Sequence, residues 1–261
     1  MAKRKLLFCF LLTVTLVLKA EASVTRFFTG NRADVNPKLF GPVHVFGGGG
    51  SDVESAIQWV IDSVRGCTDC QTKVDVVVLR ASGADGYNDF IFAMKGVDSV
   101  ETLLITDRKD SEEKAVIDTI KQAEIIFFAG GDQCNYVRHF KDTQVESAIK
   151  DVYKKGGGIG GTSAGLAIQS PFAYDGCSGS VSSNEALSNP YHSQISFTYD
   201  FFNWKNLSNT ISDTHFAARN RMGRLISFIA RQIKEKRAKR VLGFGVNERT
   251  SLVVDKNGVG R

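Results

Sequence analysis

Short apolar segments rich in β-branched residues alternate, along the first 165 residues, with segments whose apolar residues recur at helical spacing. The first kind predicts strands and the second kind predicts helices. Strands that are apolar throughout and separated by helices are typical of a parallel sheet covered on both faces, so we expect an α/β fold. The predicted strands are residues 43–46, 74–79, 102–106, 125–128 and 158–160, and the predicted helices are residues 53–64, 90–95, 112–122 and 145–153.

The pattern changes in the last third of the chain. Residues 171–210 are rich in Ser, Asn, Tyr and Phe with little periodicity, which predicts a long, partly ordered excursion near an active site. Asp213 or Thr214 is predicted to cap a helix that runs to about Lys236, and residues 241–254 predict a closing β-hairpin. Because no repeat or linker interrupts the pattern, residues 23–261 are predicted to form a single domain.

Residues 1–22 have the pattern of a secretory signal peptide. A basic start at residues 3–5 precedes an apolar run at residues 6–18, and Ala20 and Ala22 mark a small-residue cleavage site. The apolar run is shorter than the roughly 20 residues that a membrane-spanning helix needs. We therefore expect a secreted protein, extracellular or periplasmic, that has no membrane contact after cleavage. An uncleaved N-terminal anchor is the alternative.

Cleavage also changes the charge. The formal net charge of +5 falls to +2, because four cations and one anion leave with residues 1–22. A chain so close to neutral gives no reason to expect a nucleic-acid partner. The basic run at residues 231–240 alternates with Ile, Ala and Gln, which predicts a solvated helix face.

Four of the five cysteines remain after cleavage, and an even number in an oxidising compartment predicts two disulfides. Cys67 and Cys70 are expected to form a local bridge, since no second CxxC completes a zinc site. The sequence does not fix the full connectivity, and no metal or cofactor is expected. The four remaining cysteines are Cys67, Cys70, Cys134 and Cys177.

Asn206 begins the single N-glycosylation sequon.

Residues 161–165, Gly-Thr-Ser-Ala-Gly, have the G-x-S-x-G spacing of a nucleophile elbow between a predicted strand and a helix. In such a turn the serine has a strained backbone, and small neighbours prevent collisions with the strand and the helix. The N–H groups that begin the helix can stabilise a developing oxyanion. Ser163 is therefore the predicted nucleophile. Glycines that serve packing alone are the alternative.

A serine nucleophile needs a base, and the chain has four histidines. His44 lies within an apolar strand, His139 is predicted on a surface helix, and His192 in the excursion is a competitor. His215 has the best context, because the first turn of a helix would keep its imidazole neutral. The acids that could orient the imidazole are Glu185, Asp175 and Asp213, and spacing alone does not choose among them.

The glycine run 47–50 is similar to two known motifs. One is the oxyanion loop of α/β-hydrolase esterases, but their histidine follows the last strand, whereas a helix and a hairpin are expected after His215. The other is a dinucleotide fingerprint, but no acidic residue ends the second strand at the required place. We therefore predict a tight strand-to-helix turn.

Four segments of the chain form a recognisable series: residues 125–133, residues 160–165, residues 213–216 with the arginines that follow them, and residues 243–248. In this order they resemble the cyanophycinase-like members of peptidase family S51, and the resemblance covers about residues 40–255. It implies a flavodoxin-like sheet with helices on both faces and the elbow after a central strand, related to the class I glutamine amidotransferases but with serine in place of their cysteine.

The resemblance also implies roles for individual residues. It makes Ser163 the nucleophile, His215 the base and Glu185 the acid. The backbone amides near Gly131 and Ala164 are the expected oxyanion donors. An arginine side chain can bind a carboxylate through two parallel hydrogen bonds, which suits the three arginines after His215 to substrate binding. The alternative is that these three arginines lie on a solvated helix face. The implied substrate-binding residues are Gln133, Asp213, Arg219, Arg221 and Arg224.

The chain departs from the family pattern at Thr214, where many relatives have Gln, and at Asn247, where many have Asp before the glutamate. The first departure puts the identity of the cleaved peptide in doubt. The resemblance implies a cofactor-free serine peptidase that hydrolyses an aspartate-linked peptide, with the β-Asp-Arg isopeptide bond of cyanophycin as the best candidate and a homodimer as a candidate state. The alternatives are an α-aspartyl dipeptidase and an inactive secreted binding protein of the same fold.

Overall fold

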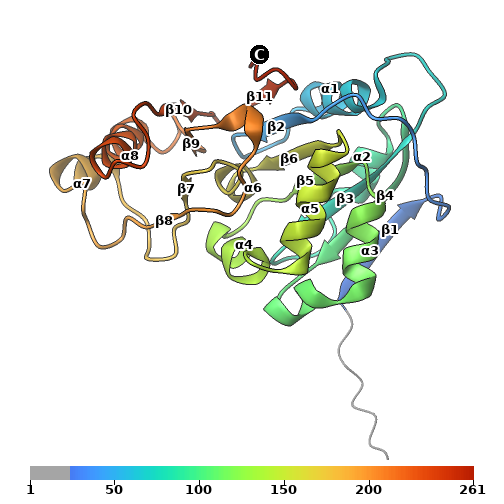
Figure 1. Cartoon of the computed structure of the whole chain (residues 1–261), viewed down its shortest axis with the longest axis horizontal. Helices are drawn as coiled ribbons and strands as arrows, with labels where there is room; N and C mark the ends of the chain where they lie inside the picture. The colour runs from blue at the N-terminus through green and yellow to red at the C-terminus, as the bar shows by residue number, and fades with distance from the viewer. Residues whose placement is uncertain (1–23) are drawn as a thin grey trace, which may run out of the picture.

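The computed structural model describes residues 24–261, so the predicted signal peptide lies outside the described residues. Seven strands form the central sheet: β1 (Thr25–Gly30), β2 (Val43–Gly47), β3 (Val74–Arg80), β4 (Val97–Leu104), β5 (Ile125–Phe128), β6 (Gly158–Thr162) and β11 (Ser251–Val254). Their order across the sheet is β1-β4-β3-β5-β6-β2-β11 (Figure 1). The five inner strands are parallel, and β1 and β11 pair antiparallel at the two edges.

Helices cover both faces because the apolar side chains of the inner strands alternate between them. In β3, Val76 and Val78 face one core, whereas Val77 and Leu79 face the other. This arrangement confirms the predicted α/β fold. One face is covered by α1 (Glu54–Arg65) and α2 (Asn88–Phe92), and the other by α3 (Lys114–Gln122), α4 (Gln133–Phe140) and α5 (Gln144–Lys154).

The five predicted strands are present, although β4 begins at Val97 rather than at residue 102. β1 was not predicted. Its apolar residues are few, and it forms an edge strand whose side chains are mostly half-buried or exposed. Within residues 24–261, no helix is both long enough and apolar enough to span a bilayer.

The last third of the chain packs into a second region at one side of the sheet (Figure 1). It is more regular than the predicted excursion, because buried aromatic side chains give it a core of its own. Tyr174 and Phe228 stack there with ring centroids 4.6 Å apart. The short helix α6 (Ala164–Ala167) precedes this region. The elements of the region are β7 (Ala173–Tyr174), α7 (Ser183–Ser188), β8 (Phe197–Thr198), β9 (Thr210–Asp213), α8 (Met222–Lys234) and β10 (Leu242–Gly245).

Two predictions for this region are wrong. The helix expected from Asp213 begins at Met222, because β9 continues through Asp213 and a turn follows it. The closing hairpin is absent from residues 241–254, since β10 pairs parallel with β9 and β11 pairs antiparallel with β2. The chain therefore crosses from the second region to the central sheet, and this crossing brings residues 246–250 beside the carboxyl end of β2.

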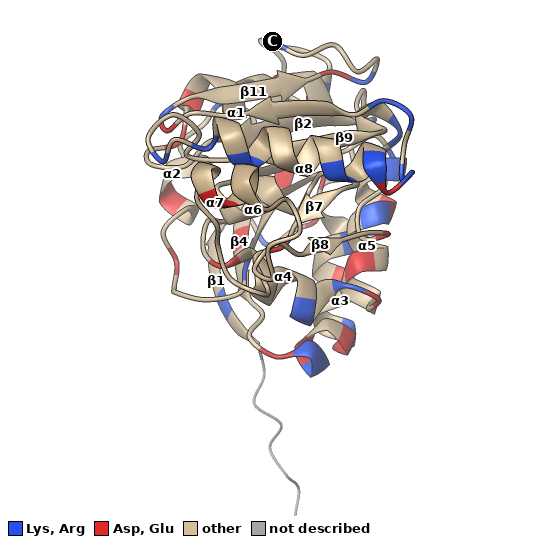
Figure 2. Ribbon diagram, turned by 90° about the vertical axis from the view of Figure 1, so that its left-hand side faces the viewer, with Lys and Arg blue, Asp and Glu red and all other residues tan. Residues whose placement is uncertain are grey.

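Charged side chains are spread over the surface. Figure 2 looks at the side of α7 and α8 and shows basic and acidic residues interspersed along the helices. Most of the basic residues between 231 and 240 are exposed, as predicted for a solvated face. Arg231 instead lies partly buried and pairs with Glu235 at 2.9 Å.

Candidate active site

Ser163 lies at the turn between β6 and α6, with φ 51° and ψ −114°. The small residues around it are required by close contacts. A Cβ on Gly161 would lie 2.6 Å from the carbonyl oxygen of Gly165, and a Cβ on Gly165 would lie 2.2 Å from that of Phe128. Larger side chains at either position would force the strand and the helix apart, so the G-x-S-x-G spacing forms the strained turn that the sequence predicts.

His215 is the histidine that the structure brings to Ser163. Its Nε2 lies 2.7 Å from the serine Oγ, and the side chain is largely buried. The predicted partner is thus in place, but the reason given for it is wrong. His215 lies in the turn between β9 and α8 with φ 44°, and not in the first turn of a helix.

The acid beside His215 is Glu248, not Glu185. Its Oε1 lies 2.6 Å from Nδ1 of the imidazole. This hydrogen bond, together with the positive charges of His215 and Arg219, holds the pKa of the Glu248 carboxyl below its usual value. Serine, imidazole and carboxylate therefore lie in the order that a serine nucleophile needs.

Glu185 is occupied elsewhere. It is exposed and forms a capping box at the start of α7, where its Oε2 accepts hydrogen bonds of 2.8 Å from the N–H and the Oγ of Ser182. These bonds lower the pKa of its carboxyl. The prediction that Glu185 orients the imidazole is wrong because Ser182, rather than His215, is its partner.

Asp175 and His44, two of the other candidates, also have structural partners. Asp175 accepts hydrogen bonds from Ser196 and Thr198 and ties β7 to β8. His44 is fully buried and bonds to Asn206, as expected of a packed strand residue, and burial lowers its pKa to about 4.

Asn206, the sequon residue, is held within this network. Its amide nitrogen donates to the carbonyl of Asp255 at 3.2 Å, and its Oδ1 also lies 2.9 Å from the hydroxyl of Tyr153.

The glycine run 47–50 connects all three members of the site. The carbonyl of Gly47 accepts the N–H of Ser163 at 3.0 Å, that of Gly48 accepts the N–H of His215 at 2.7 Å, and that of Gly49 accepts the N–H of Arg249, next to Glu248, at 2.9 Å. The run is the strand-to-helix turn that the sequence predicts. Its role in positioning the site was missed, because these partners are distant along the chain.

The amides of Gly131 and Ala164 are the predicted oxyanion donors. Among residues 24–261, neither donates a hydrogen bond to another group. Ala164 directly follows Ser163, and a Cβ on Gly130, the neighbour of Gly131, would lie 3.6 Å from the Cβ of Ser163. Unpaired amides beside a serine nucleophile are the donors that a tetrahedral intermediate requires.

The three predicted substrate-binding arginines have different environments. Arg224 is buried and grips Asp213 with two hydrogen bonds of 2.6 Å, so neither side chain is free to bind a substrate. Arg221 is half-buried and bonds to Thr214 and, at 3.4 Å, to Asp213. Arg219 is exposed. The prediction that Asp213 and Arg224 contact substrate is wrong, because they form a buried ion pair.

Gln133 begins α4 on the side of the elbow where the glycines of residues 130 and 131 lie. Its Nε2 would be 2.9 Å from a Cβ on Gly176, so it faces the excursion. A disulfide between Cys134 and Cys177 joins the same two segments. Gln133 is thus held by a covalent link next to it. The second disulfide joins Cys67 to Cys70.

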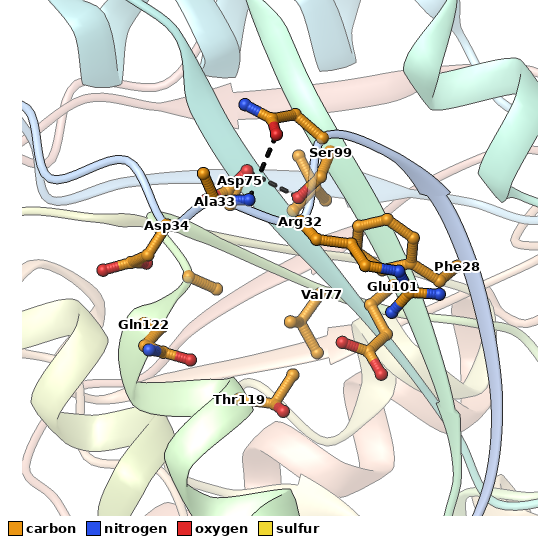
Figure 3. A pocket seen from close by; sticks show the side chains of 13 residues that line it. Phe28, Arg32, Ala33, Asp34, Asp75, Val77, Ser99, Glu101, Thr119 and Gln122 are labelled. Carbon is orange, nitrogen blue, oxygen red and sulfur yellow. Dashed lines mark hydrogen bonds between the residues drawn. The ribbon is translucent and has the colours of Figure 1, made fainter.

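A pocket of about 100 Å³ lies at the opposite edge of the sheet (Figure 3). Asp75, near the amino end of β3, accepts hydrogen bonds there from Ser99 at 2.5 Å and from the N–H of Val35 at 3.2 Å. Both carboxylate oxygens therefore have partners. Within residues 24–261, no group of His, Cys, Asp and Glu is arranged to hold a metal ion.

The curated proteins to which this chain is similar include cyanophycinases. The chain is 30% identical over 168 residues to a cyanophycinase from Geminocystis herdmanii, and the aligned segment covers 64% of this chain and 56% of that protein. It is 31% identical over 170 residues to a cyanophycinase from Trichormus variabilis, and this aligned segment covers 64% of this chain and 51% of that protein. The chain thus spans about half the length of the curated relatives it matches.

A solved structure shares the fold. The crystal structure of a peptidase from an acI-B1 Actinobacterium matches 83% of this chain and 84% of its own, with a TM-score of 0.57 and 17% sequence identity. The model of peptidase family S51 matches residues 91–259, a segment that contains Ser163, His215 and Glu248. Because that match covers more than half of the chain, this protein belongs to peptidase family S51.

Proposed function

We propose that this protein is a serine peptidase in which Ser163, His215 and Glu248 act together. The observation that carries the proposal is the continuous chain of hydrogen bonds from Ser163 Oγ through the imidazole to Glu248, at 2.7 Å and 2.6 Å. Nε2 faces the serine and Nδ1 faces the carboxylate, so the tautomer protonated on Nδ1 can accept the serine proton.

The reaction follows from this geometry. Ser163 Oγ attacks the carbonyl carbon of the scissile bond while its proton passes to Nε2 of His215. The amides of Gly131 and Ala164 bind the oxyanion, and the imidazolium then protonates the leaving amine. Water attacks the resulting ester and gives its proton to Nε2, which releases the acid and restores the serine hydroxyl.

The proposed substrate is a peptide with an aspartyl linkage, and the β-Asp-Arg bond of cyanophycin is the first candidate. The support is the similarity to proteins named cyanophycinase. An α-aspartyl dipeptide is the alternative, since the same elbow serves either linkage. Secretion is proposed from the signal-like residues 1–22 and is compatible with the two disulfides.

A fluorophosphonate probe and a Ser163→Ala variant test the proposal. Labelling of the folded protein at Ser163, together with hydrolysis of cyanophycin or an aspartyl peptide that the variant has lost, is the expected result. A folded protein that neither reacts with the probe nor hydrolyses any aspartyl peptide would instead be a binding protein. Hydrolysis that survives in Ser163→Ala would rule out the serine mechanism.

A further inference from the structure

Arg80 ends β3 at the carboxyl edge of the sheet, the edge at which Ser163 lies. Its side chain is half-buried, and its Nε donates to the carbonyl of Ser82 at 3.1 Å. Within residues 24–261 no carboxylate pairs with it, whereas Asp213 pairs with both Arg221 and Arg224. A partly desolvated cation without a counter-charge is unfavourable in a folded protein unless a ligand supplies that charge.

The loop after β3 is shaped around this guanidinium. A Cβ on Gly83 would lie 2.9 Å from Nη2, and a Cβ on Gly86 would lie 3.5 Å from Nη1. The ring of Tyr87 lies on a further side, 5.9 Å from Cζ. Two glycines, a carbonyl and an aromatic ring thus hold Arg80 in place without neutralising it.

Two paths of contacts connect Arg80 to Ser163. On one path, the Oγ of Ser82 would lie 3.4 Å from a Cβ on Gly131, whose amide is a proposed oxyanion donor. On the other path, Tyr87 donates a hydrogen bond of 2.8 Å to Asp52, which borders Gly47. Since Gly47 accepts the N–H of Ser163, the loop that holds the guanidinium is linked by direct contacts to the backbone around the serine.

We propose that Arg80 is a specificity-determining residue that binds a carboxylate of the peptide next to the scissile bond. The proposal rests on the proposed function and identifies which substrates that site selects. A guanidinium binds a carboxylate through two parallel N–H donors, which fixes both the position and the orientation of the ligand. Arg80 would then supply the charge recognition that the buried Arg224 cannot supply.

The test measures binding in a Ser163→Ala background, so that no turnover is needed. Calorimetry compares a β-aspartyl-arginine dipeptide with two derivatives in which one or the other free carboxylate is amidated. With Arg80 present, one amide should bind about 10- to 100-fold more weakly than the parent peptide, as expected for one charge-assisted contact. Arg80→Gln should abolish this difference. Arg240→Gln, which removes an exposed cation, is the control and should preserve it.

Three results would overturn the assignment. The affinity difference between the parent peptide and the amide could be unchanged in Arg80→Gln, or it could be lost equally in Arg240→Gln. The third such result is that the parent peptide does not bind. Arg80→Lys keeps the charge and serves if the glutamine variant does not fold; it should retain only part of the preference. Hydrolysis by the Ser163 protein is measured separately. An inert protein whose carboxylate preference depends on Arg80 would reject the peptidase proposal and retain this one.

Discussion

Gly49 lies directly against the imidazole of His215. A Cβ on Gly49 would lie 2.2 Å from Cε1 of the ring, which is far too close for two carbon atoms that are not bonded to each other. We therefore expect Gly49→Ala to displace the imidazole from Ser163 and to reduce kcat about 100-fold or more, because catalysis depends on sub-ångström positioning. Single-turnover kinetics with an aspartyl peptide measure this effect.

Gly50→Ala is the matched control. Gly50 also has a positive φ, of 74°, but the nearest atom to its Cβ would be 3.5 Å away. Both variants place alanine at a positive φ, 104° at position 49 and 74° at position 50, which costs on the order of 1–3 kcal/mol. Only Gly49→Ala adds the collision with His215. Equal activity in the two variants would show that the glycine contact does not hold the imidazole.

Glu248 and Glu185 form a second matched pair. Glu248→Gln should lower kcat roughly 1,000- to 10,000-fold, because an amide cannot stabilise the imidazolium as the carboxylate does. Glu185→Gln should leave kcat unchanged and reduce stability by at most about 1 kcal/mol, since Gln also serves in a capping box. The opposite pattern in kcat would restore Glu185 as the orienting acid.

The pH dependence of wild-type activity follows from the same contact. The hydrogen bond from His215 lowers the pKa of Glu248, so this carboxyl stays ionised below its usual pKa of 4.5. Protonation of Glu248 should therefore not limit kcat/KM until the pH falls well below 4.5. A rate profile that loses activity at a pH near 4.5, where free glutamate titrates, would contradict this assignment.

The Cys134–Cys177 disulfide should matter for substrate binding. It ties the start of α4, which carries Gln133, to the excursion across a sequence separation of 43 residues. Replacing both cysteines with Ser should raise KM several-fold and lower stability by about 2–4 kcal/mol. The control is Cys67→Ser/Cys70→Ser, whose short loop lies at the end of α1. A KM that changes equally in both double variants would contradict a specific role.

Glu124 provides a stability prediction away from the site. It is buried and accepts the N–H of Asp75 at 2.8 Å, and burial raises the pKa of its carboxyl from 4.5 to about 7. The folded state therefore favours the protonated form, and stability is lost as the pH rises through that range. Glu124→Gln, which is neutral throughout, should be more stable than wild type at pH 8, by on the order of 3 kcal/mol.

The difference should shrink below pH 4.5, where wild-type Glu124 is protonated in both the folded and the unfolded chain. Thermal unfolding of the two proteins at several pH values measures it. A constant difference at all pH values would show that Glu124 is not a titrating group in this range.

Much of the fold could be predicted from the sequence because the inner strands are apolar throughout and the helices between them are amphipathic. The local geometry around Ser163 was equally predictable, since its glycines stand at fixed spacing. Glu248 was missed although residues 243–248 were matched to the family, because the residues alone do not show that β10 and β11 belong to different sheets. That separation is what turns the connecting residues toward His215.

The buried pair of Asp213 and Arg224 marks a second limit. Nothing in the spacing of the three arginines distinguishes a side chain that points into a cleft from one that points into the core. The difference arises because α8 begins at Met222, which turns Arg224 toward β9 and leaves Arg219 exposed in the preceding turn. The length of that turn is set by tertiary packing, so it could not be found from local pattern.

The contacts of the glycine run 47–50 have a consequence for the synthesis of the protein. Its carbonyls bind the N–H groups of residues 163, 215 and 249, which the ribosome adds in that order. During synthesis, the serine and the histidine exist before their acid does. The arrangement of serine, imidazole and carboxylate is therefore complete only after residues 246–250 have reached the carboxyl end of β2, beside the pairing of β11 with β2.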